Sequence, residues 1–538
     1  MGRPERIDTA DFPAAVAAGW DRRRFLTATT AAAALAFSVG TPQRSEAKIV
    51  EDALPYPYTM GVASGDPLPD AVVIWTRLAP KPLEPYGGMP QASWRVEWEM
   101  AEDPDFSRRV LRGRTLAHPE YYHSVHVDVR GLRPGREYFY RFKAGGQVSE
   151  TGRTKTAPAE DANPDRLKFA VASCQSFPDG YYTALRHIAD EDLDAVLFLG
   201  DYIYESGINS EGGLHEVPEP LPPEFASDAI TLERYRLQYS LYKSEPDLIA
   251  AHQSAPWIAT WDDHEVTSNY VSLDSDSWNQ PIDFAVQRAN AYRAYWEHLP
   301  LRLPEPDGPD LKLYRRFRYG KLAQLDVIDT RQYRDDQAPG SGDSAVRRDP
   351  SRTVLGDQQE RWLLNGLTNS PARWKLVPQQ IPMAQLDSAG GSGLSLNMDA
   401  WDGYLPARQR ILDAVRESGT ENFVVLTGDA HTNYALELLA DFDNLESQPV
   451  GVELVGTSIC SDRDGADTTP ALQTRLVENP HLKFANQQRG YLLCTVTPEL
   501  LSTDFKIVPY VTRRDAPISV RQRIVVESGK PELILDSA

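Results

Sequence analysis

The sequence is poor in cysteine, in positive charge and in long apolar runs. Only three cysteines, Cys174, Cys460 and Cys494, occur among 538 residues, and so small and odd a number excludes a disulfide-built scaffold. Lys and Arg total 56 against 77 Asp and Glu, a formal net charge of −21, which excludes a nucleic acid held by its phosphate backbone. No run reaches the roughly 20 apolar residues of a membrane-spanning helix, so we expect no membrane span.

The remaining composition is that of a globular protein. Hydrophobic residues make up 41% and charged residues 25%, which is ordinary for a chain that buries a sizeable core. The length predicts at least two domains besides any targeting segment. We expect the chain to act as a monomer.

The first 47 residues have the pattern of an export signal. Residues 22–26 read Arg-Arg-Arg-Phe-Leu and precede an uncharged, alanine-rich run at 27–39, as in twin-arginine signals. Ser45 and Ala47 supply small residues for a cleavage site. An amphipathic helix is the alternative. We predict a signal peptide at 1–47, the twin-arginine export machinery as a partner, and a secreted, periplasmic or cell-envelope location. Because this pathway carries folded proteins, often loaded with a cofactor, a metal site is expected.

Residues 48–157 are predicted to form an antiparallel β-sandwich. Polar and apolar residues alternate in four runs, at 71–76, 94–99, 123–129 and 137–142. Gly and Pro turns separate such runs, as at 131–135, and this period of two is typical of half-buried strands. The segment 132–140 is similar to a late strand of a fibronectin type III or Ig-like module.

After a linker rich in Pro, Ala and Asp at 156–165, the pattern changes to apolar strands separated by helical segments. This alternation predicts an α/β domain over 158–538, with its chemistry at the strand ends. The last 50 residues are again strand-like, and no separate function is assigned to them.

Four of these predicted strands end in residues that bind metal ions. The four ends are Ser173-Cys174-Gln175, Gly200-Asp201, Asp262-Asp263-His264 and Gly428-Asp429-Ala430-His431. Grouped carboxylates repel one another unless cations neutralise them, and oxygen ligands suit hard cations. Taken singly, each cluster has a simpler explanation, since Asp often caps a helix and a lone Cys is often a small buried hydrophobe. Together the four indicate a metal site at one edge of the sheet.

The order of these motifs resembles that of the PhoD-like alkaline phosphatases and phosphodiesterases, within the metallophosphoesterase group. The resemblance covers nearly the whole mature chain. It rests on GVASGDP at 61–67, VASCQ at 171–175, GDYIYE at 200–205, WDDHE at 261–265, DTRQYR at 329–334, GDAHTN at 428–433 and GTS at 456–458. The fold that it implies is α/β, a four-layer metallophosphoesterase core behind the N-terminal antiparallel β-sandwich.

The resemblance also implies cofactors and their ligands. Iron(III) would be held by Cys174, Asp201, Tyr204 and His431, and one or more calcium ions by Asp201, Asp263 and Asp429. Thiolate and phenolate suit a trivalent iron, whereas carboxylates suit calcium. Cys174 and Asp429 stand where related motifs have Asp and His. Asp262 is a further candidate metal ligand, but it is equally open to being a partner of His264 or simply the last residue of its strand.

The activity that follows is hydrolysis of phosphate monoesters or diesters by water that the metals activate. His264 is the predicted catalytic residue, as a general acid or as a stabiliser of transition-state charge. Asn269 and Arg331 are candidate phosphate ligands, because guanidinium matches phosphate bidentately. A loop cap and a structural ion pair are their respective alternatives.

Other activities remain open at this point. A phospholipase D-type phosphodiesterase acting on a phospholipid would use the same scaffold. A catalytically inactive secreted binding protein is an alternative from another class. A dizinc hydrolase of carboxylic esters or amides is disfavoured by the few His residues near the motifs, because zinc prefers imidazole and thiolate.

Overall fold

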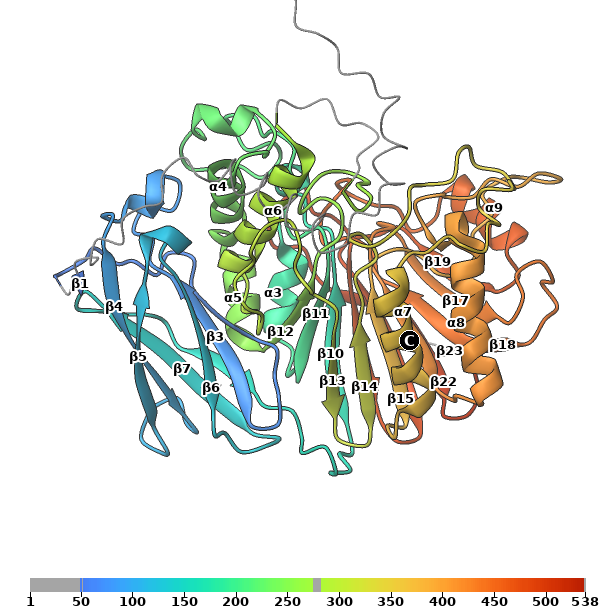
Figure 1. The fold of residues 1–538 in the computed structure, drawn as a ribbon, viewed down its shortest axis with the longest axis horizontal. Coiled ribbons are helices and arrows are strands. Elements are labelled where there is room, and N and C mark those ends of the chain that lie inside the picture. Colours follow the sequence, from blue (N-terminus) through green and yellow to red (C-terminus); the bar gives the residue numbers. More distant parts are fainter. Residues whose placement is uncertain (1–48, 51, 274–281, 537–538) are drawn as a thin grey trace, which may run out of the picture. The chain divides into compact units, whose positions relative to one another are not determined.

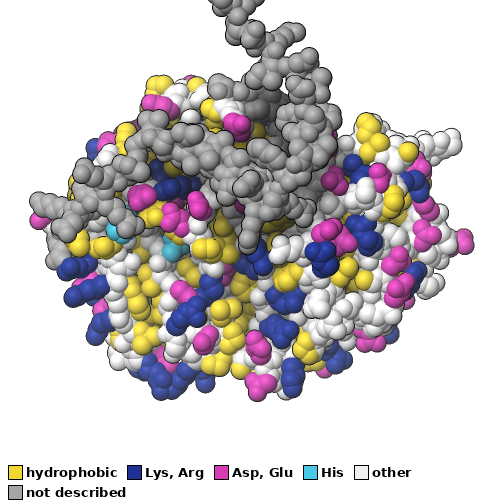
Figure 2. Space-filling model, in the orientation of Figure 1, with side chains coloured by type: hydrophobic (Ala, Val, Ile, Leu, Met, Phe, Trp, Pro, Cys, Tyr) yellow, Lys and Arg dark blue, Asp and Glu magenta, His cyan; other side chains and the backbone are white. Residues whose placement is uncertain are grey.

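The computed structural model describes residues 49–50, 52–273 and 282–536. The predicted export signal lies outside these residues. None of the described helices is both long and apolar enough to cross a membrane. On the face drawn in Figure 2, Lys and Arg are interspersed with Asp and Glu and form no continuous basic patch among the described residues.

The larger of two central sheets has ten strands. Its order is β23-β22-β21-β20-β10-β11-β12-β2-β3-β6. The strands β10, β11 and β12 run parallel to one another, so their carboxyl ends share one edge. The bounds are β2 Val62–Gly65, β3 Ala71–Arg77, β6 Ser124–Arg130, β10 Leu167–Ala172, β11 Ala195–Leu199, β12 Trp257–Thr260, β20 Gly490–Val496, β21 Leu500–Ile507, β22 Ser519–Glu527 and β23 Ile534–Asp536.

The second central sheet has seven strands in the order β13-β14-β15-β16-β18-β17-β19. Its strands β14, β15, β16 and β18 are parallel. The bounds are β13 Arg315–Tyr319, β14 Ala323–Val327, β15 Trp374–Gln379, β16 Phe423–Thr427, β17 Asn433–Leu439, β18 Pro449–Val455 and β19 Leu482–Asn486.

Helices cover the outer faces of the two sheets, giving four layers (Figure 1). Alternation along each strand divides its side chains between two cores. In β10, Phe169 and Val171 face the core between the sheets, whereas Ala170 and Ala172 face the core beneath the first helices. The helices over the ten-stranded sheet are α3 Thr183–Ala189, α4 Leu232–Lys243, α5 Pro246–Ser254 and α6 Phe284–His298; those over the seven-stranded sheet are α7 Gly356–Asn369, α8 Leu405–Ser418 and α9 Pro470–Glu478. Short 3₁₀ helices are η2 Pro85–Gly88, η3 Pro119–Tyr121, η4 Phe177–Asp179, η5 Pro223–Ala226 and η6 Trp401–Tyr404.

The N-terminal strands form two packed layers, but these are not separate from the rest. Strands β4 and β7 pair antiparallel, with β5, β8 and β9 alongside, and they pack against β3 and β6 over a shared core. The other layer, β2, β3 and β6, continues the ten-stranded sheet, because Gly65 of β2 pairs with Trp257 of β12. The sequence predicted the alternating strands but not this junction. The remaining bounds are β1 Ile49–Val50, β4 Ser93–Ala101, β5 Leu111–Ala117, β7 Glu137–Ala144, β8 Gln147–Val148 and β9 Gly152–Lys155.

A lysine without a carboxylate partner among the described residues lies deep in this fold. Lys243, the last residue of α4, is 1% exposed. Its Nζ donates to the Tyr202 hydroxyl at 3.2 Å and lies 4.2 Å from the centre of the Trp75 ring. Burial lowers the pKa of the Lys243 ammonium well below its usual range.

Candidate metal centre

The two sheets bring together the metal ligands predicted from the sequence. Cys174 and Asp201 follow β10 and β11, and the Asp262-Asp263-His264 run follows β12. Asp429 and His431 follow β16 of the second sheet. Three groups of residues are found in which the ligand atoms of each group lie within 4.8 Å of one another: Cys174, Asp201 and His431; Asp201, Asp263 and His264; and Asp262, Asp263 and Asp429. Because Asp201 and Asp263 belong to two groups each, the three form one continuous cluster.

Tyr204 joins the group that contains the thiol. Its hydroxyl lies 3.0 Å from Asp201 Oδ2 and 3.1 Å from His431 Nε2. The Ser461 hydroxyl donates to the same oxygen at 2.8 Å. The four residues predicted to hold iron therefore lie side by side.

The backbone at this cluster takes an unusual form. The φ angle lies between 48° and 60° at four of the ligands, Cys174, Asp201, Asp429 and His431. This left-handed region is uncommon for residues other than glycine, and residues that adopt it are concentrated at functional sites. In this conformation the chain turns sharply where each strand ends, directing successive residues into the same space.

Gly200 explains how two of these strand ends approach so closely. A Cβ at Gly200, whose φ is +108°, would lie 2.4 Å from Asp262 Cβ and 2.6 Å from Asp262 N. No residue with a side chain fits there without moving the Asp262 backbone, so the glycine of the Gly-Asp motif is a packing requirement of the cluster.

The cluster has more buried acid than its cations neutralise. Burial and neighbouring carboxylates raise the pKa values of Asp201 and Asp429 well above their usual range. Burial and Asp201 likewise raise the pKa values of the Cys174 thiol and the Tyr204 phenol. Asp262 Oδ2 and Asp263 Oδ1 are buried and accept no hydrogen bond from the described residues. The carboxylates, the thiol and the phenol are all groups that bind cations. A bound cation would stabilise the ionised form of each group.

Arg331 lies beneath the acids rather than among solvent-facing groups. Its side chain is 0% exposed; its Nε is hydrogen-bonded to Asp262, and its second nitrogen donates to Asp399 at 2.7 Å. The third nitrogen lies 3.4 Å from Asp263 and 3.5 Å from Asp429. One guanidinium thus contacts four carboxylates. Despite burial, these acids raise the pKa of Arg331. The four contacts favour a structural ion pair over phosphate binding as the role of Arg331.

Arg331 and burial also distinguish the two neighbouring acids. Burial raises the pKa of Asp262 to about 6, although Arg331 opposes this shift. Burial acts in the same direction on Asp263, but Arg331 and His264 hold the pKa of Asp263 below its usual value.

His264 faces the cluster and is held by a second acid. Its Nδ1 lies 2.7 Å from Glu205 Oε2, and its Nε2 lies 3.9 Å from Asp263 Oδ2. Burial lowers its pKa, but Asp263, Asp201 and Glu205 outweigh burial and raise the pKa well above its usual value. The side chain is 22% exposed, so the imidazole is accessible from solvent.

Asn269 contributes its backbone to this arrangement. Its N–H donates to Asp263 Oδ2 at 2.6 Å, and its carbonyl accepts from Gln337 Nε2 at 2.8 Å. This contact fixes Asp263. The neighbouring Ser268 N–H donates to Glu205 Oε1 at 2.8 Å, so the same loop also holds the partner of His264.

Some residues that build the site were missed in the sequence analysis. Glu265 is fully buried, and its carboxylate accepts hydrogen bonds from the backbone N–H groups of Asp201, Tyr202 and Asp262. Its place inside the WDDHE motif was the available signal. Asp399, which binds Arg331, lies in no recognised motif and gave no signal.

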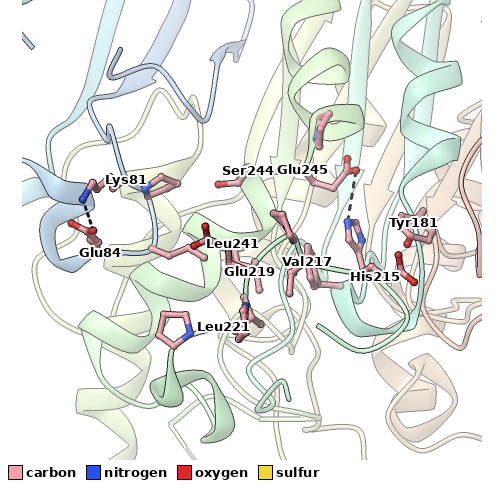
Figure 3. A pocket seen from close by; sticks show the side chains of 18 of the residues that line it. Lys81, Glu84, Tyr181, His215, Val217, Glu219, Leu221, Leu241, Ser244 and Glu245 are labelled. Atoms are coloured by element: carbon pink, nitrogen blue, oxygen red, sulfur yellow. Dashed lines mark hydrogen bonds and ion pairs between the residues drawn. The ribbon is translucent and has the colours of Figure 1, made fainter. Parts of the chain in front are cut away.

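The structure also contains a hollow of about 1000 Å³ (Figure 3). It is lined by Val217, Leu221 and Leu241 among others, with His215 Nε2 lying 3.8 Å from Glu245 Oε1 in its wall. None of the predicted site residues lines it. The proline-rich segment at 217–222 borders this hollow.

Comparison with known proteins agrees with the geometry. A family model described as PhoD-like phosphatase matches residues 169–505, and one described as its N-terminal domain matches 43–158. The chain belongs to the PhoD-like phosphatase family. It is therefore a hydrolase of phosphoric esters.

Similar proteins extend over most of this PhoD-like phosphatase. Alkaline phosphatase D of Bacillus subtilis (strain 168) is 44% identical over 525 residues, which cover 96% of this chain and 89% of the relative. A solved structure described as the structure of PhoD is also 44% identical, with a TM-score of 0.86 over 91% of this chain and 94% of that one. The mixed α/β fold with several sheets is thus shared.

Proposed function

We propose that this PhoD-like phosphatase is an exported, metal-dependent phosphoesterase that hydrolyses phosphate monoesters, diesters or both. Under this proposal Cys174, Asp201, Tyr204 and His431 hold iron(III), and Asp201, Asp263 and Asp429 hold calcium. The observation that carries the proposal is the continuous cluster of buried ligands, in which two carboxylate oxygens lack hydrogen bonds from the described residues. Such a cluster is costly to bury without cations.

The proposal divides the chain in three. A twin-arginine signal at 1–47 precedes an Ig- or fibronectin III-like sandwich at 48–157 and a metallophosphoesterase domain at 158–538. The two packed layers of β3, β6, β4 and β7 support the sandwich. The four layers around the site support the catalytic domain.

The chain's own residues have distinct roles in this reaction. When bound, the cations polarise the phosphoryl oxygens and lower the pKa of the attacking water. Glu205 orients His264 through Nδ1 and leaves Nε2 to protonate the departing oxygen. Arg331 and Asp399 keep Asp262 and Asp263 in place, so Arg331 is a positioning residue in this proposal.

Asp262 is assigned to the same supporting group. One of its oxygens is occupied by Arg331, and the other accepts no hydrogen bond from the described residues. Asp262 therefore keeps one oxygen for a cation, but it belongs to only one of the three ligand groups. Asp201 and Asp263 each belong to two of them.

A metal analysis of matched cysteine variants tests the proposal. Cys174 and Cys494 are both buried and free, but Cys494 lies in β20 with its sulfur 3.4 Å from the Thr503 hydroxyl. We expect Cys174→Ser to lose iron and hydrolysis of aryl phosphates, and Cys494→Ser to keep both. Exposure of the parent protein to EGTA should abolish turnover reversibly without removing iron. An active protein free of iron and calcium would contradict the proposal.

A further inference from the structure

A small pocket opens directly beside the metal cluster. It has a volume of about 140 Å³, and Asp429, the predicted calcium ligand, forms part of its wall together with Ala430. Tyr434, Arg475, Ser388 and Asn397 also line it. Because the pocket and the cluster share Asp429, a molecule whose phosphate lies at the cluster can extend into this pocket.

Arg475 is the cation of this pocket, and it has no carboxylate partner within ion-pair distance among the residues that the structure describes. It lies in the last turn of α9 and is half-buried. Its guanidinium donates to the Tyr434 hydroxyl, a neutral acceptor. A guanidinium offers five donors, so most of its capacity remains for another partner.

The other acid of the pocket is already occupied. Asp402 binds Arg408 at 2.7 Å through one oxygen and accepts from the Leu386 N–H at 3.1 Å through the other. Asp429 lies on the side of the metal cluster, 3.5 Å from Arg331. The pocket therefore presents an arginine whose anionic partner is missing within the described chain.

A segment that lines the pocket is hydrogen-bonded to the end of the helix that carries Arg475. Asn479, just after α9, exchanges hydrogen bonds with the backbone of Asp387 at 2.9 and 2.8 Å. Glu478 accepts from the Gly391 N–H at 2.9 Å. The glycine-rich segment at 387–397 and α9 are thus tied together, which fixes Arg475 relative to the pocket.

We propose that Arg475 binds an anionic group on the leaving alcohol, so that the enzyme favours esters of alcohols that carry a carboxylate or a second phosphate. This inference rests on the proposed phosphoesterase function. Guanidinium pairs with either anion through two parallel hydrogen bonds. A pocket of 140 Å³ has the volume of roughly five water molecules, which suits an anion on a short carbon chain.

The test compares two esters that differ by one charge. Metal-loaded protein is assayed with 3-phosphoglycerate, whose leaving group carries a carboxylate, and with glycerol 3-phosphate, whose leaving group is neutral. We expect the parent protein to prefer the first in kcat/KM. Arg475→Gln should lower the ratio of the two kcat/KM values about tenfold or more, the size of a charge-assisted hydrogen bond. The change should fall mainly in KM, because the contact forms before the phosphoryl group reacts.

Two further variants complete the experiment. Arg475→Lys should restore part of the ratio, and Arg361→Gln, which removes an exposed arginine from α7, should leave it unchanged. An unchanged ratio in Arg475→Gln, or an equal loss for both esters, would overturn the assignment of Arg475. If the parent protein hydrolysed neither ester nor any aryl phosphate, the proposed function itself would be overturned.

Discussion

Replacing Lys243 by methionine is expected to stabilise the protein at pH 8 and to flatten the dependence of its stability on pH. The Lys243 amine is buried beside Tyr202 and Trp75, and its pKa lies well below the ordinary value of 10.5. Between these two pKa values the folded chain lacks a proton that the unfolded chain binds. The free energy of unfolding of the parent protein therefore rises with pH in this window.

The size of the effect follows from the linkage relation. Each pH unit changes the contribution of one such group by about 1.4 kcal/mol. With Lys243 uncharged in the folded chain, removing its proton at pH 8 costs about 3 kcal/mol relative to the ordinary pKa of 10.5, and the hydrogen bond to Tyr202 returns about 1 kcal/mol. Methionine avoids both, so Lys243→Met should be more stable by about 2 kcal/mol at pH 8. This advantage should fall to nearly zero by about pH 9.5.

Urea unfolding at several pH values between 8 and 9.5, at one fixed metal concentration, measures this difference directly. Subtracting the variant from the parent removes the contributions of the other titrating groups. Lys321→Met, which changes an exposed lysine between β13 and β14, should show the slope of the parent. Parallel pH profiles for the parent and Lys243→Met would refute the reasoning, because they would mean that Lys243 remains charged in the folded protein.

Three further changes address the metal centre. A phenolate bound to iron(III) is expected to give the protein a violet absorption, which Tyr204→Phe should remove; a spectrum of the variant that retains this absorption would remove Tyr204 from the ligand set. Gly200→Ala should lower the free energy of unfolding by about 2 kcal/mol or more, because its Cβ would lie 2.4 Å from that of Asp262; Gly131→Ala, at a φ of +78° but in open space, should cost only about 1 kcal/mol in the same melting assay. His264→Ala should keep its metals in elemental analysis and lower turnover about 100-fold or more, with a smaller deficit for aryl than for alkyl phosphates; an equal deficit would indicate charge stabilisation instead.

The residues at the strand ends were predictable because they follow the apolar runs directly. Cys174, Asp201 and Asp429 each lie two residues beyond the end of a parallel strand, and the parallel strands of a sheet bring their carboxyl ends to one edge. Asp399 was not predictable, because it comes from an irregular segment that only tertiary packing brings to Arg331. The pairing of Gly65 with Trp257 was missed for the same reason.

The role of Arg331 shows a further limit of the sequence. An arginine near acidic motifs is compatible with binding phosphate or with pairing to carboxylates, and the two differ only in burial. In the folded chain its side chain is fully buried between Asp262 and Asp399. Periodicity carries no information about which side of a ligand cluster a residue occupies.

The origin of the ligands in two sheets means that a bound cation would act as a long-range cross-link. Cys174 and His431 lie about 250 residues apart in the sequence and follow strands of different sheets. Closing a loop of that length with a covalent bridge removes about 5 kcal/mol of chain entropy from the unfolded state. The three cysteines of the chain are all free, so no disulfide supplies this restriction. A cation bound by ligands from both sheets would restrict the unfolded chain in a similar way. Stripping the metal would then lower the melting temperature of both sheets together.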